Sequence, residues 1–388
     1  MKPRSVKILA IAVVALFGIL FALNSGDRRQ AAPGVDLLFP ELKERLNDLN
    51  AVTITDADGT ITVRRDGADG RWIVPENGGY AANTGTLRQL LLALADARKV
   101  EEKTANPDLY ERLGVVDPRG EGSEEGSGVL VSARGDDAAV SVILGDAAQR
   151  EFRYARIPEQ PESWLIDQNP PIPEDPSGWL SPDIVDIEAA EIQSVAIRHT
   201  DGEVLRIRKE NADESNFVVE DIPEGRELSY PTVANSIAGV LANLTLEDVT
   251  AGARPEEEAT TTADFTTFDG LQLSVNVFAE DGEAEGEESG QQHWITLLAS
   301  ANPTVEPADE EDVAAEASDA SDTSTTAEEQ SSAEQSEDSE QSKDPADVAA
   351  GINERVSGWA YRIPEYKANQ LTRRWEDILS DPGEDEQP

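Results

Sequence analysis

The chain has 388 residues, no cysteine and a formal net charge of −46, from 78 acidic against 32 basic residues. A surface of this charge repels the phosphates of nucleic acids and of anionic lipid headgroups, so we exclude nucleic acid as a partner. The absence of cysteine excludes disulfides and lipid attachment through cysteine. A chain of this kind outside the cytoplasm therefore depends on packing for its stability.

An apolar run at residues 6–23 carries a single charge, Lys7, at its edge. As a helix, about 18 residues extend about 27 Å, close to the hydrocarbon thickness of about 30 Å. Lys2 and Arg4 precede it and predict a cytoplasmic N-terminus. No Ala-x-Ala cleavage site follows, which favours an uncleaved anchor over a removable signal. We therefore expect residues 1–27 to hold a transmembrane signal anchor in a bacterial inner membrane, with the rest of the chain in the periplasm.

The first set of predicted elements follows a short polar tether. Pro40 and leucines at helical spacing predict a helix over residues 40–49. Alternating apolar residues on both sides of Asp56-Ala57-Asp58-Gly59 then predict a β-hairpin. The sequence next predicts a strand at residues 72–75 and an amphipathic helix at residues 84–98. Together these elements predict a first α+β unit over residues 36–178.

The same order of elements returns later in the chain. Val195 follows Val52 by 143 residues and opens a second alternating hairpin. An aromatic strand at residues 217–219 and an amphipathic helix beginning near Pro231 come next, followed by strands at residues 271–278 and 293–298. We therefore expect a second unit over residues 179–380, homologous to the first, and the fold class α+β, with antiparallel strands and an amphipathic helix in each unit.

A four-residue echo closes each predicted unit. Arg156-Ile157-Pro158-Glu159 recurs 206 residues later as Arg362-Ile363-Pro364-Glu365. The larger spacing indicates an insertion in the second unit, and residues 301–350 have the composition for it. They are rich in Ala, Ser, Thr, Glu, Asp and Gln and contain no aromatic residue, so we expect a disordered acidic insertion.

The C-terminal part predicts one more helix, over residues 367–379. Its apolar residues recur at helical spacing and share one face. On this helix Arg373 and Arg374 are expected to pair with Glu376 and Asp377.

A search for reaction chemistry finds no catalytic, cofactor-binding or metal-binding residue to predict. His199 and His293 have no ligand at metal-binding spacing, so we expect ordinary surface or edge roles. The chain also lacks the Gly-x-Ser-x-Gly pattern and a phosphate-binding glycine loop. Asp56–Gly59 and Arg134-Gly135-Asp136 lie between alternating strands and predict turns.

Two further features have a structural and a functional interpretation. Glu159 and Glu365 each follow an Ile-Pro pair, which favours polar strand exits over a catalytic role. The six tryptophans favour core positions, with a sugar-stacking platform as the alternative.

Several motifs resemble a known family. They are Phe39-Pro40 before the leucine-spaced helix, the hairpin, Trp72-x-Val74-Pro75, Tyr110-Glu111-Arg112-Leu113-Gly114-Val115-Val116-Asp117-Pro118, and Gly358-Trp359-Ala360-Tyr361-Arg362-Ile363-Pro364-Glu365-Tyr366-Lys367. Together they resemble the bacterial domain-of-unknown-function family 4340, over about residues 38–380. The second unit departs from the pattern by its acidic insertion and by Phe217 in place of a tryptophan. The resemblance implies a single-span envelope protein, often encoded beside an ABC transporter of the gliding-motility type, and it transfers no catalytic residue.

The first hypothesis is a non-enzymatic accessory protein, anchored through residues 6–23 and associated with an ABC transporter or another envelope protein. The alternative is an envelope module that binds a glycan or peptide in a cleft between the units, since tandem α+β units form such clefts. An envelope hydrolase is the third hypothesis.

Overall fold

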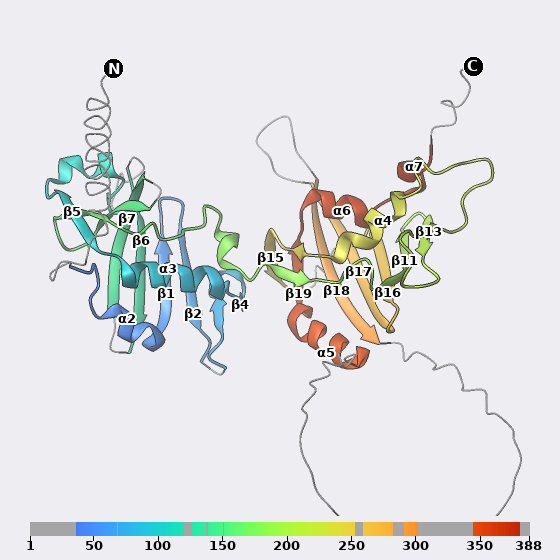
Figure 1. The fold of residues 1–388 in the computed structure, drawn as a ribbon, viewed down its shortest axis with the longest axis horizontal. Coiled ribbons are helices and arrows are strands. Elements are labelled where there is room, and N and C mark those ends of the chain that lie inside the picture. Colours follow the sequence, from blue (N-terminus) through green and yellow to red (C-terminus); the bar gives the residue numbers. More distant parts are fainter. Residues whose placement is uncertain are drawn as a thin grey trace, which may run out of the picture. The chain divides into compact units, whose positions relative to one another are not determined.

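The computed structural model describes residues 36–67, 69–119, 126–136, 139–149, 151–252, 259–281, 291–301 and 344–380. The chain divides into two compact units between Ser181 and Pro182. Both are mixed α and β with mostly antiparallel sheets, as expected for the fold class (Figure 1). Within the described ranges no helix has the length and apolarity to cross a membrane. The span predicted at residues 6–23 lies outside those ranges.

Unit 1 contains a nine-stranded antiparallel sheet in the order β4-β3-β2-β1-β6-β7-β8-β9-β5. Its strands are β1 Leu49–Thr55, β2 Thr60–Arg65, β3 Trp72–Val74, β4 Tyr80–Ala81, β5 Lys99–Thr104, β6 Val129–Gly135, β7 Ala139–Gln149, β8 Phe152–Arg156 and β9 Ser163–Ile166. Its α-helices are α2 Leu42–Arg45 and α3 Thr84–Asp96.

The predicted hairpin and helix of unit 1 are confirmed as β1–β2 and α3. The Asn83 side chain caps α3 by accepting a hydrogen bond from the Thr86 amide. Leu87, Leu90 and Leu94 lie on one helical face and are buried. The burial of this face gives the helix its place in the core of the unit.

The helix predicted over residues 40–49 is shorter than expected. Helix α2 has four residues, a 3₁₀ turn follows to Asp48, and Leu49 already begins β1. Leu49 is only 1% exposed and pairs with Gly135 of β6. The helix ends early because Leu49 belongs to β1, a central strand of the sheet. The spacing of Leu49 from the preceding leucines had also been compatible with the helix.

Unit 2 contains an eight-stranded sheet in the order β13-β12-β11-β16-β17-β18-β19-β15 and a separate pair, β10 and β14. Its strands are β10 Asp183–Val185, β11 Ile192–His199, β12 Val204–Arg208, β13 Val218–Val219, β14 Leu244–Thr245, β15 Asp248–Ala251, β16 Thr261–Thr267, β17 Leu271–Asp281, β18 Gln291–Ala301 and β19 Trp359–Arg362. Its α-helices are α4 Val233–Ala238, α5 Pro345–Val356, α6 Glu365–Leu371 and α7 Trp375–Ile378.

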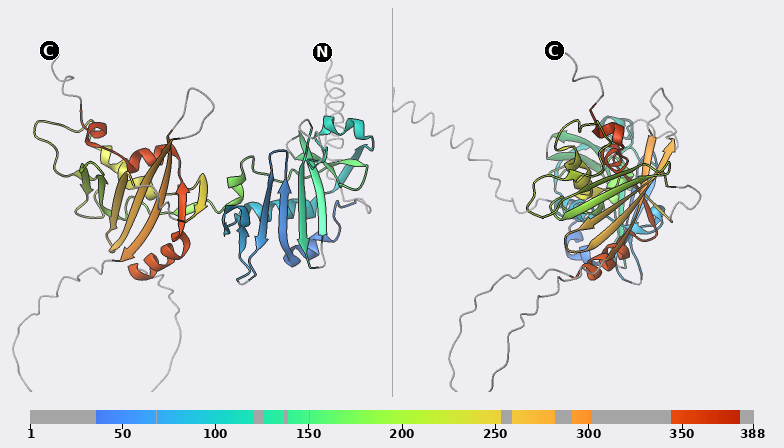
Figure 2. Two further views of the ribbon diagram at one scale, coloured as in Figure 1. Left: turned by 180° about the vertical axis from the view of Figure 1, so that it is seen from behind. Right: turned by 90° about the vertical axis from the view of Figure 1, so that its right-hand side faces the viewer.

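The two sheets have the same order of strands once the extra edge strand β4 of unit 1 is set aside. In each, a hairpin and a third strand form one end, and a later strand (β6 or β16) adds to the first strand of the hairpin. A strand that follows the helical segment, β5 in unit 1 and β15 after the short β14 in unit 2, closes the opposite end. Figure 2 shows both sheets from behind and from the side.

The repeated Arg-Ile-Pro-Glu run lies at the ends of two strands that occupy different positions in the two sheets. Arg156 ends β8, whereas Arg362 ends β19. β19 lies between β18 and β15, which is the position that β9 takes between β8 and β5. The interpretation of the echo as equivalent ends of two copies was therefore wrong. An Arg-Ile-Pro-Glu run ends a strand because proline has no amide hydrogen for the ladder, and this holds at either position.

The expected disordered insertion, residues 301–350, overlaps two regular elements. Ala301 is the last residue of β18, and residues 345–350 form the first half of α5. The Asp344 side chain caps this helix on the Ala346 amide, and Pro345 occupies its first turn. Ala349 and Ile352 are buried, so a stretch with an acidic and polar composition still provides an apolar helical face. Residues 302–343 lie outside the described residues.

The single helix predicted over residues 367–379 is two helices, α6 and α7, separated by Thr372–Arg374. Arg374 has extended backbone, with φ −115° and ψ 169°. Its guanidinium contacts Asp201 and Glu203 at 2.7 Å each, instead of the carboxylates on its own segment. These tertiary contacts outweigh helix continuation, and the expected Asp377 bonds to the backbone of Arg374, where its carboxylate accepts from the Arg374 amide and its amide donates to the Arg374 carbonyl.

Candidate interaction surface

The sheet of unit 2 buries alternate residues and leaves the others open. In β16, for example, Ala263 and Phe265 are buried, whereas Thr262, Asp264 and Thr266 between them are half-buried. Side chains of a strand alternate between the two faces, so the half-buried set lies on one face. The same alternation runs through β12, β11, β17 and β18.

The strand register aligns this open face in three rows of five positions, one from each of the strands β12, β11, β16, β17 and β18. The rows are Arg208–Ser194–Thr266–Gln272–Ser300, Arg206–Ala196–Asp264–Ser274–Leu298, and Val204–Arg198–Thr262–Asn276–Thr296. We call these fifteen positions the unit-2 face. It holds three arginines and one carboxylate, whereas the whole chain has 78 acidic and 32 basic residues. Counted over its own fifteen positions, the unit-2 face is therefore net basic on an acidic protein, and the other carboxylates that pair with its arginines, Glu210, Glu220 and Asp221, lie just outside these positions.

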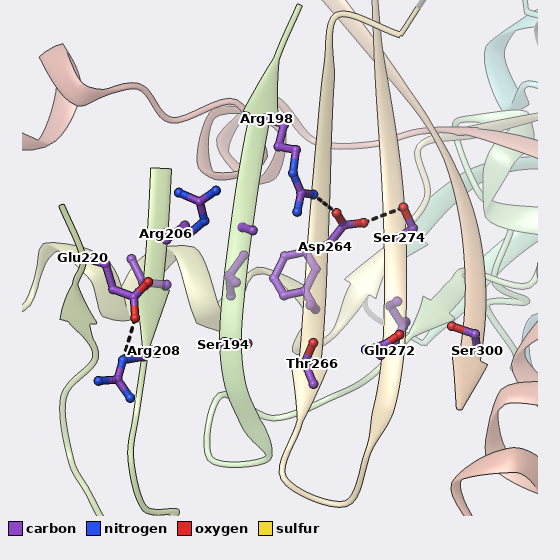
Figure 3. Close-up of a pocket in the computed structure, with 15 residues that line it drawn as sticks. Ser194, Arg198, Arg206, Arg208, Glu220, Asp264, Thr266, Gln272, Ser274 and Ser300 are labelled. Atoms are coloured by element: carbon purple, nitrogen blue, oxygen red, sulfur yellow. Dashed lines mark hydrogen bonds and ion pairs between the residues drawn. The ribbon is translucent and has the colours of Figure 1, made fainter. Parts of the chain in front are cut away.

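The charged side chains of the unit-2 face form short cross-strand contacts (Figure 3). Arg198 of β11 pairs with Asp264 of β16, and Ser274 of β17 donates to the same carboxylate at 2.7 Å. Next to these two contacts, the Nε of Arg208 lies 2.6 Å from the carboxylate of Glu220, just after β13. Each of these carboxylates reaches a guanidinium from a neighbouring strand, so the spacing of the sheet suits arginine–carboxylate pairs.

Arg206 is the least engaged of the three arginines. Its one ion pair among the described residues is with Asp221, at 3.7 Å, and the Asp221 side chain is 79% exposed. In Figure 3 its guanidinium stands clear of the other side chains drawn. Small side chains, Ser194 and Ala196, lie beside the long arginines of β12. The difference in length makes a shallow hollow of about 560 Å³ along the face.

Unit 1 has an open face of the same kind, with rows made by β2, β1, β6 and β7. They are Arg64–Ala51–Arg134–Ala139 and Thr62–Thr53–Ser132–Ser141. We call these eight positions the unit-1 face. All eight are half-buried or exposed, and two are arginines while none is a carboxylate. Both units therefore present small polar side chains and arginines on this side of their sheets, and the equivalent strands β2 and β12 each carry arginine.

The next row of unit 1 is covered by the segment that carries the family motif. Leu130 and Ile143 continue the open side, but they pack with Tyr110 and Val115 in a buried cluster. The Arg156 guanidinium lies 4.4 Å from the Tyr110 ring centroid and donates to the Val115 carbonyl at 3.0 Å. Residues 110–118 therefore form a cover over one end of the sheet, and the motif has a packing role.

Gly114 allows this cover to lie close to the sheet. Its φ is +64°, and an added Cβ would lie 2.7 Å from a carboxylate oxygen of Asp146 and 3.0 Å from the Asp146 amide nitrogen. Glycine is the residue that meets both demands without strain.

In unit 2 the corresponding end of the face holds a smaller apolar cluster of Phe278, Trp294 and Ala360, with Ala259 packed against it.

The two histidines have different environments. His199 lies at the end of β11, one of the two positions expected, but it is 7% exposed and is therefore not a surface residue. Its Nε2 donates to the Arg373 carbonyl at 3.1 Å, and its Nδ1 lies 3.0 Å from the Thr261 hydroxyl. His199 thereby ties the C-terminal segment to the sheet. His293 on β18 is half-buried, and burial lowers its pKa below the ordinary value.

The other residues singled out in the sequence are found in structural positions. Asp56–Gly59 is the turn between β1 and β2, where the Asp56 carboxylate accepts from the amides of Asp58 and Gly59. Glu159 and Glu365 are exposed and follow strand ends. All six tryptophans are buried or half-buried, so the described residues offer no exposed tryptophan platform for a sugar. In the described ranges no three His, Cys, Asp or Glu side chains are grouped to hold a metal ion.

Comparison with known proteins identifies the family. The profile of a family described as a domain of unknown function, DUF4340, matches residues 72–264. The chain belongs to this family. The matched range begins at β3 and ends in β16, so it includes the DUF4340 motif cover of unit 1 and the first strands of the unit-2 face. No curated protein and no solved structure matches the chain.

Proposed function

We propose that this DUF4340 protein is a non-enzymatic accessory protein of the bacterial envelope, held in the inner membrane by residues 6–23 with its bulk in the periplasm. It would associate with an ABC transporter of the gliding-motility type or with another envelope assembly. The observation that carries the docking role is that each unit buries one side of its sheet and leaves an open polar area on the other. Such an area suits contact with another protein better than enclosure of a small substrate.

We further propose that the two units are homologous copies. The shared order of strands supports this, and so does the arginine on the second hairpin strand, Arg64 in β2 and Arg208 in β12, 144 residues apart. A duplicated unit gives two docking areas of related chemistry on one chain. Linked areas raise the avidity for a partner that reaches both.

The anchor is tested by extraction of membranes from cells that produce the full chain with a C-terminal tag. The protein should stay in the pellet after alkaline carbonate treatment, and a tagged chain without residues 1–27 should be released. Release of the full chain would contradict the anchor, because a spanning helix stays in the bilayer under these conditions.

The docking role is tested by photo-crosslinking in the native membrane. A crosslinking residue at Ser300, exposed on the unit-2 face, should give an adduct with an envelope protein. The matched control is Glu354, exposed on α5. Adducts of equal yield at Ser300 and Glu354, or adducts at neither, would contradict docking through the face.

A further inference from the structure

The positions of the two open faces carry more positive than negative charge, whereas the chain as a whole has a large negative charge. The unit-2 face holds arginines at three of its fifteen positions and one aspartate, and the unit-1 face holds two arginines and no carboxylate. The rest of the chain must therefore be even more acidic than the formal −46 indicates. A local basic area on an acidic protein attracts an anionic partner at short range and leaves long-range attraction to other anions weak.

We infer that these faces bind an acidic polypeptide segment of a partner protein, with Arg206 and Arg208 in unit 2 and Arg64 and Arg134 in unit 1 as the carboxylate anchors. The inference deepens the proposed function by naming the chemistry of the partner. Arginine presents a planar fork of donors that matches a carboxylate, and the small hydroxyl side chains between the arginines supply further donors and acceptors.

The contacts inside the unit-2 face show that carboxylates suit these arginines. Glu220 and Glu210, both just outside the fifteen positions, contact Arg208 at 2.6 and 3.3 Å, and Asp264 contacts Arg198. The three arginine side chains remain 45–49% exposed beside these pairs, so about half of each side chain still faces solvent. An extended segment laid along the first row would meet Arg208 at β12, the Thr266 hydroxyl at β16 and the Gln272 amide at β17, whereas the second row offers Arg206 at β12 but the Asp264 carboxylate at β16.

Other occupants match the charge and the side chains of the faces less well. Nucleic acids and anionic lipid surfaces extend beyond the faces, so their phosphates would also meet the acidic remainder of the chain, whereas a short segment can lie within one face. A glycan would need an exposed aromatic ring for stacking, and none of the fifteen positions of the unit-2 face is aromatic. A second copy would bring another formal −46 to the complex.

The experiment measures the binding of a fluorescent glutamate homopolymer to the full chain in detergent micelles. Binding should weaken as the ionic strength rises from about 0.01 to about 0.15 M, where the Debye length falls from about 30 to about 8 Å. The double variant Arg206→Glu/Arg208→Glu should lose affinity about tenfold, because two attractions become repulsions. Arg206→Lys/Arg208→Lys should retain part of the affinity, since the charge remains and the fork is lost.

The matched control variant is Arg88→Glu/Arg355→Glu, which changes the net charge equally through exposed arginines on α3 and α5. It should lose less than about twofold, because its charges lie away from the faces. Equal losses in the two double variants would overturn the inference. Circular dichroism of each variant establishes that the fold is retained.

Deletion of residues 305–340 separates a partner from the acidic stretch of this chain itself. Unchanged affinity for the probe supports a partner segment, whereas an increase of about tenfold would overturn it and assign the faces to the chain's own acidic residues. The proposed function fails separately. If the probe binds but Ser300 gives no adduct in the membrane, only the proposed docking role is contradicted. If Ser300 gives adducts but the probe does not bind, only the inference that the partner segment is acidic is contradicted.

Discussion

Arg374 is the residue that holds the C-terminal segment of unit 2 on the β11–β12 hairpin. Its guanidinium contacts Asp201 and Glu203, and the neighbouring Trp375 amide donates to Glu203 at 2.7 Å. The Asp201 carboxylate also accepts from the Glu203 amide at 3.0 Å. These contacts, first the backbone hydrogen bond and then the Arg374 contact, hold the pKa of Asp201 below its ordinary value of 3.8.

The first prediction concerns acid stability. A lowered carboxylate pKa stabilises the folded state above the ordinary pKa, and this contribution is lost as the pH falls through the lowered value. Arg374→Ala should therefore unfold at lower urea concentration than the wild type at pH 7, and the difference should shrink as the pH falls below about 3.8. Urea titrations at several pH values measure it.

The control for this prediction is Arg355→Ala, which removes an exposed arginine of α5. Its difference from the wild type should be small and change little with pH, because surface charges away from partners contribute little. A gap between Arg374→Ala and the wild type that stays constant down to pH 3 would refute the role of the Arg374 contact in the low pKa.

At the scale of elements, α5 completes the edge of β18. Strand β19 pairs with β18 only at Trp294 and Ile295, so the following part of β18 lacks a strand on that side. The Asn353 side chain fills one place there, donating to the Ala299 carbonyl at 2.7 Å and accepting from the Ala299 amide at 2.9 Å. The side-chain amide of Asn353 thereby makes the two hydrogen bonds that a neighbouring strand would make, and this part of the β18 edge is covered.

The second prediction follows from this contact. Asn353→Ala leaves both backbone groups of Ala299 without their partner, at about 1–3 kcal/mol for a buried polar group. We expect a loss of about 2–4 kcal/mol in the free energy of unfolding, measured by urea denaturation of the full chain. Glu354→Ala, one residue on and exposed, should change stability by less than about 0.5 kcal/mol. Similar values for the two variants would show that the edge is held by other contacts.

The sequence predicted those elements whose pattern is local and missed those decided by distant partners. Alternation predicted β1–β2 and β11–β12, and leucine spacing predicted α3. The break before α7 depends on Asp201, which lies 173 residues from Arg374. Helix α5 was hidden because its composition is polar and only a few small or branched residues form its buried face.

The open faces could not be predicted in the same way. The composition of β11 and β12 shows the arginines, but their row neighbours come from β16 and β17 and depend on register. Arg198 and Asp264 are 66 residues apart and meet only through the β11–β16 pairing. The signal in the sequence was arginine at alternate positions of a strand, 206 and 208, in an acidic chain.

On the scale of the whole molecule, each unit has its own sheet and its own buried core. The described residues divide between Ser181 and Pro182, and every strand pairs within its own unit. A domain with a complete core can fold alone. The third prediction is therefore that residues 182–388, produced without the first unit, fold by themselves.

The isolated second unit should show a β-rich circular dichroism spectrum and a cooperative urea transition, since a sheet and its helices form one cooperative core. Arg374→Ala should lower the midpoint of this transition, as it does in the full chain, because Asp201 and Glu203 belong to the same unit. A fragment ending at residue 371 is the matched control. It lacks α7 and the Arg374 contacts, so it should unfold at lower urea than the complete second unit. A random-coil spectrum for residues 182–388 would contradict the independence of the unit and make the first unit part of its folding core.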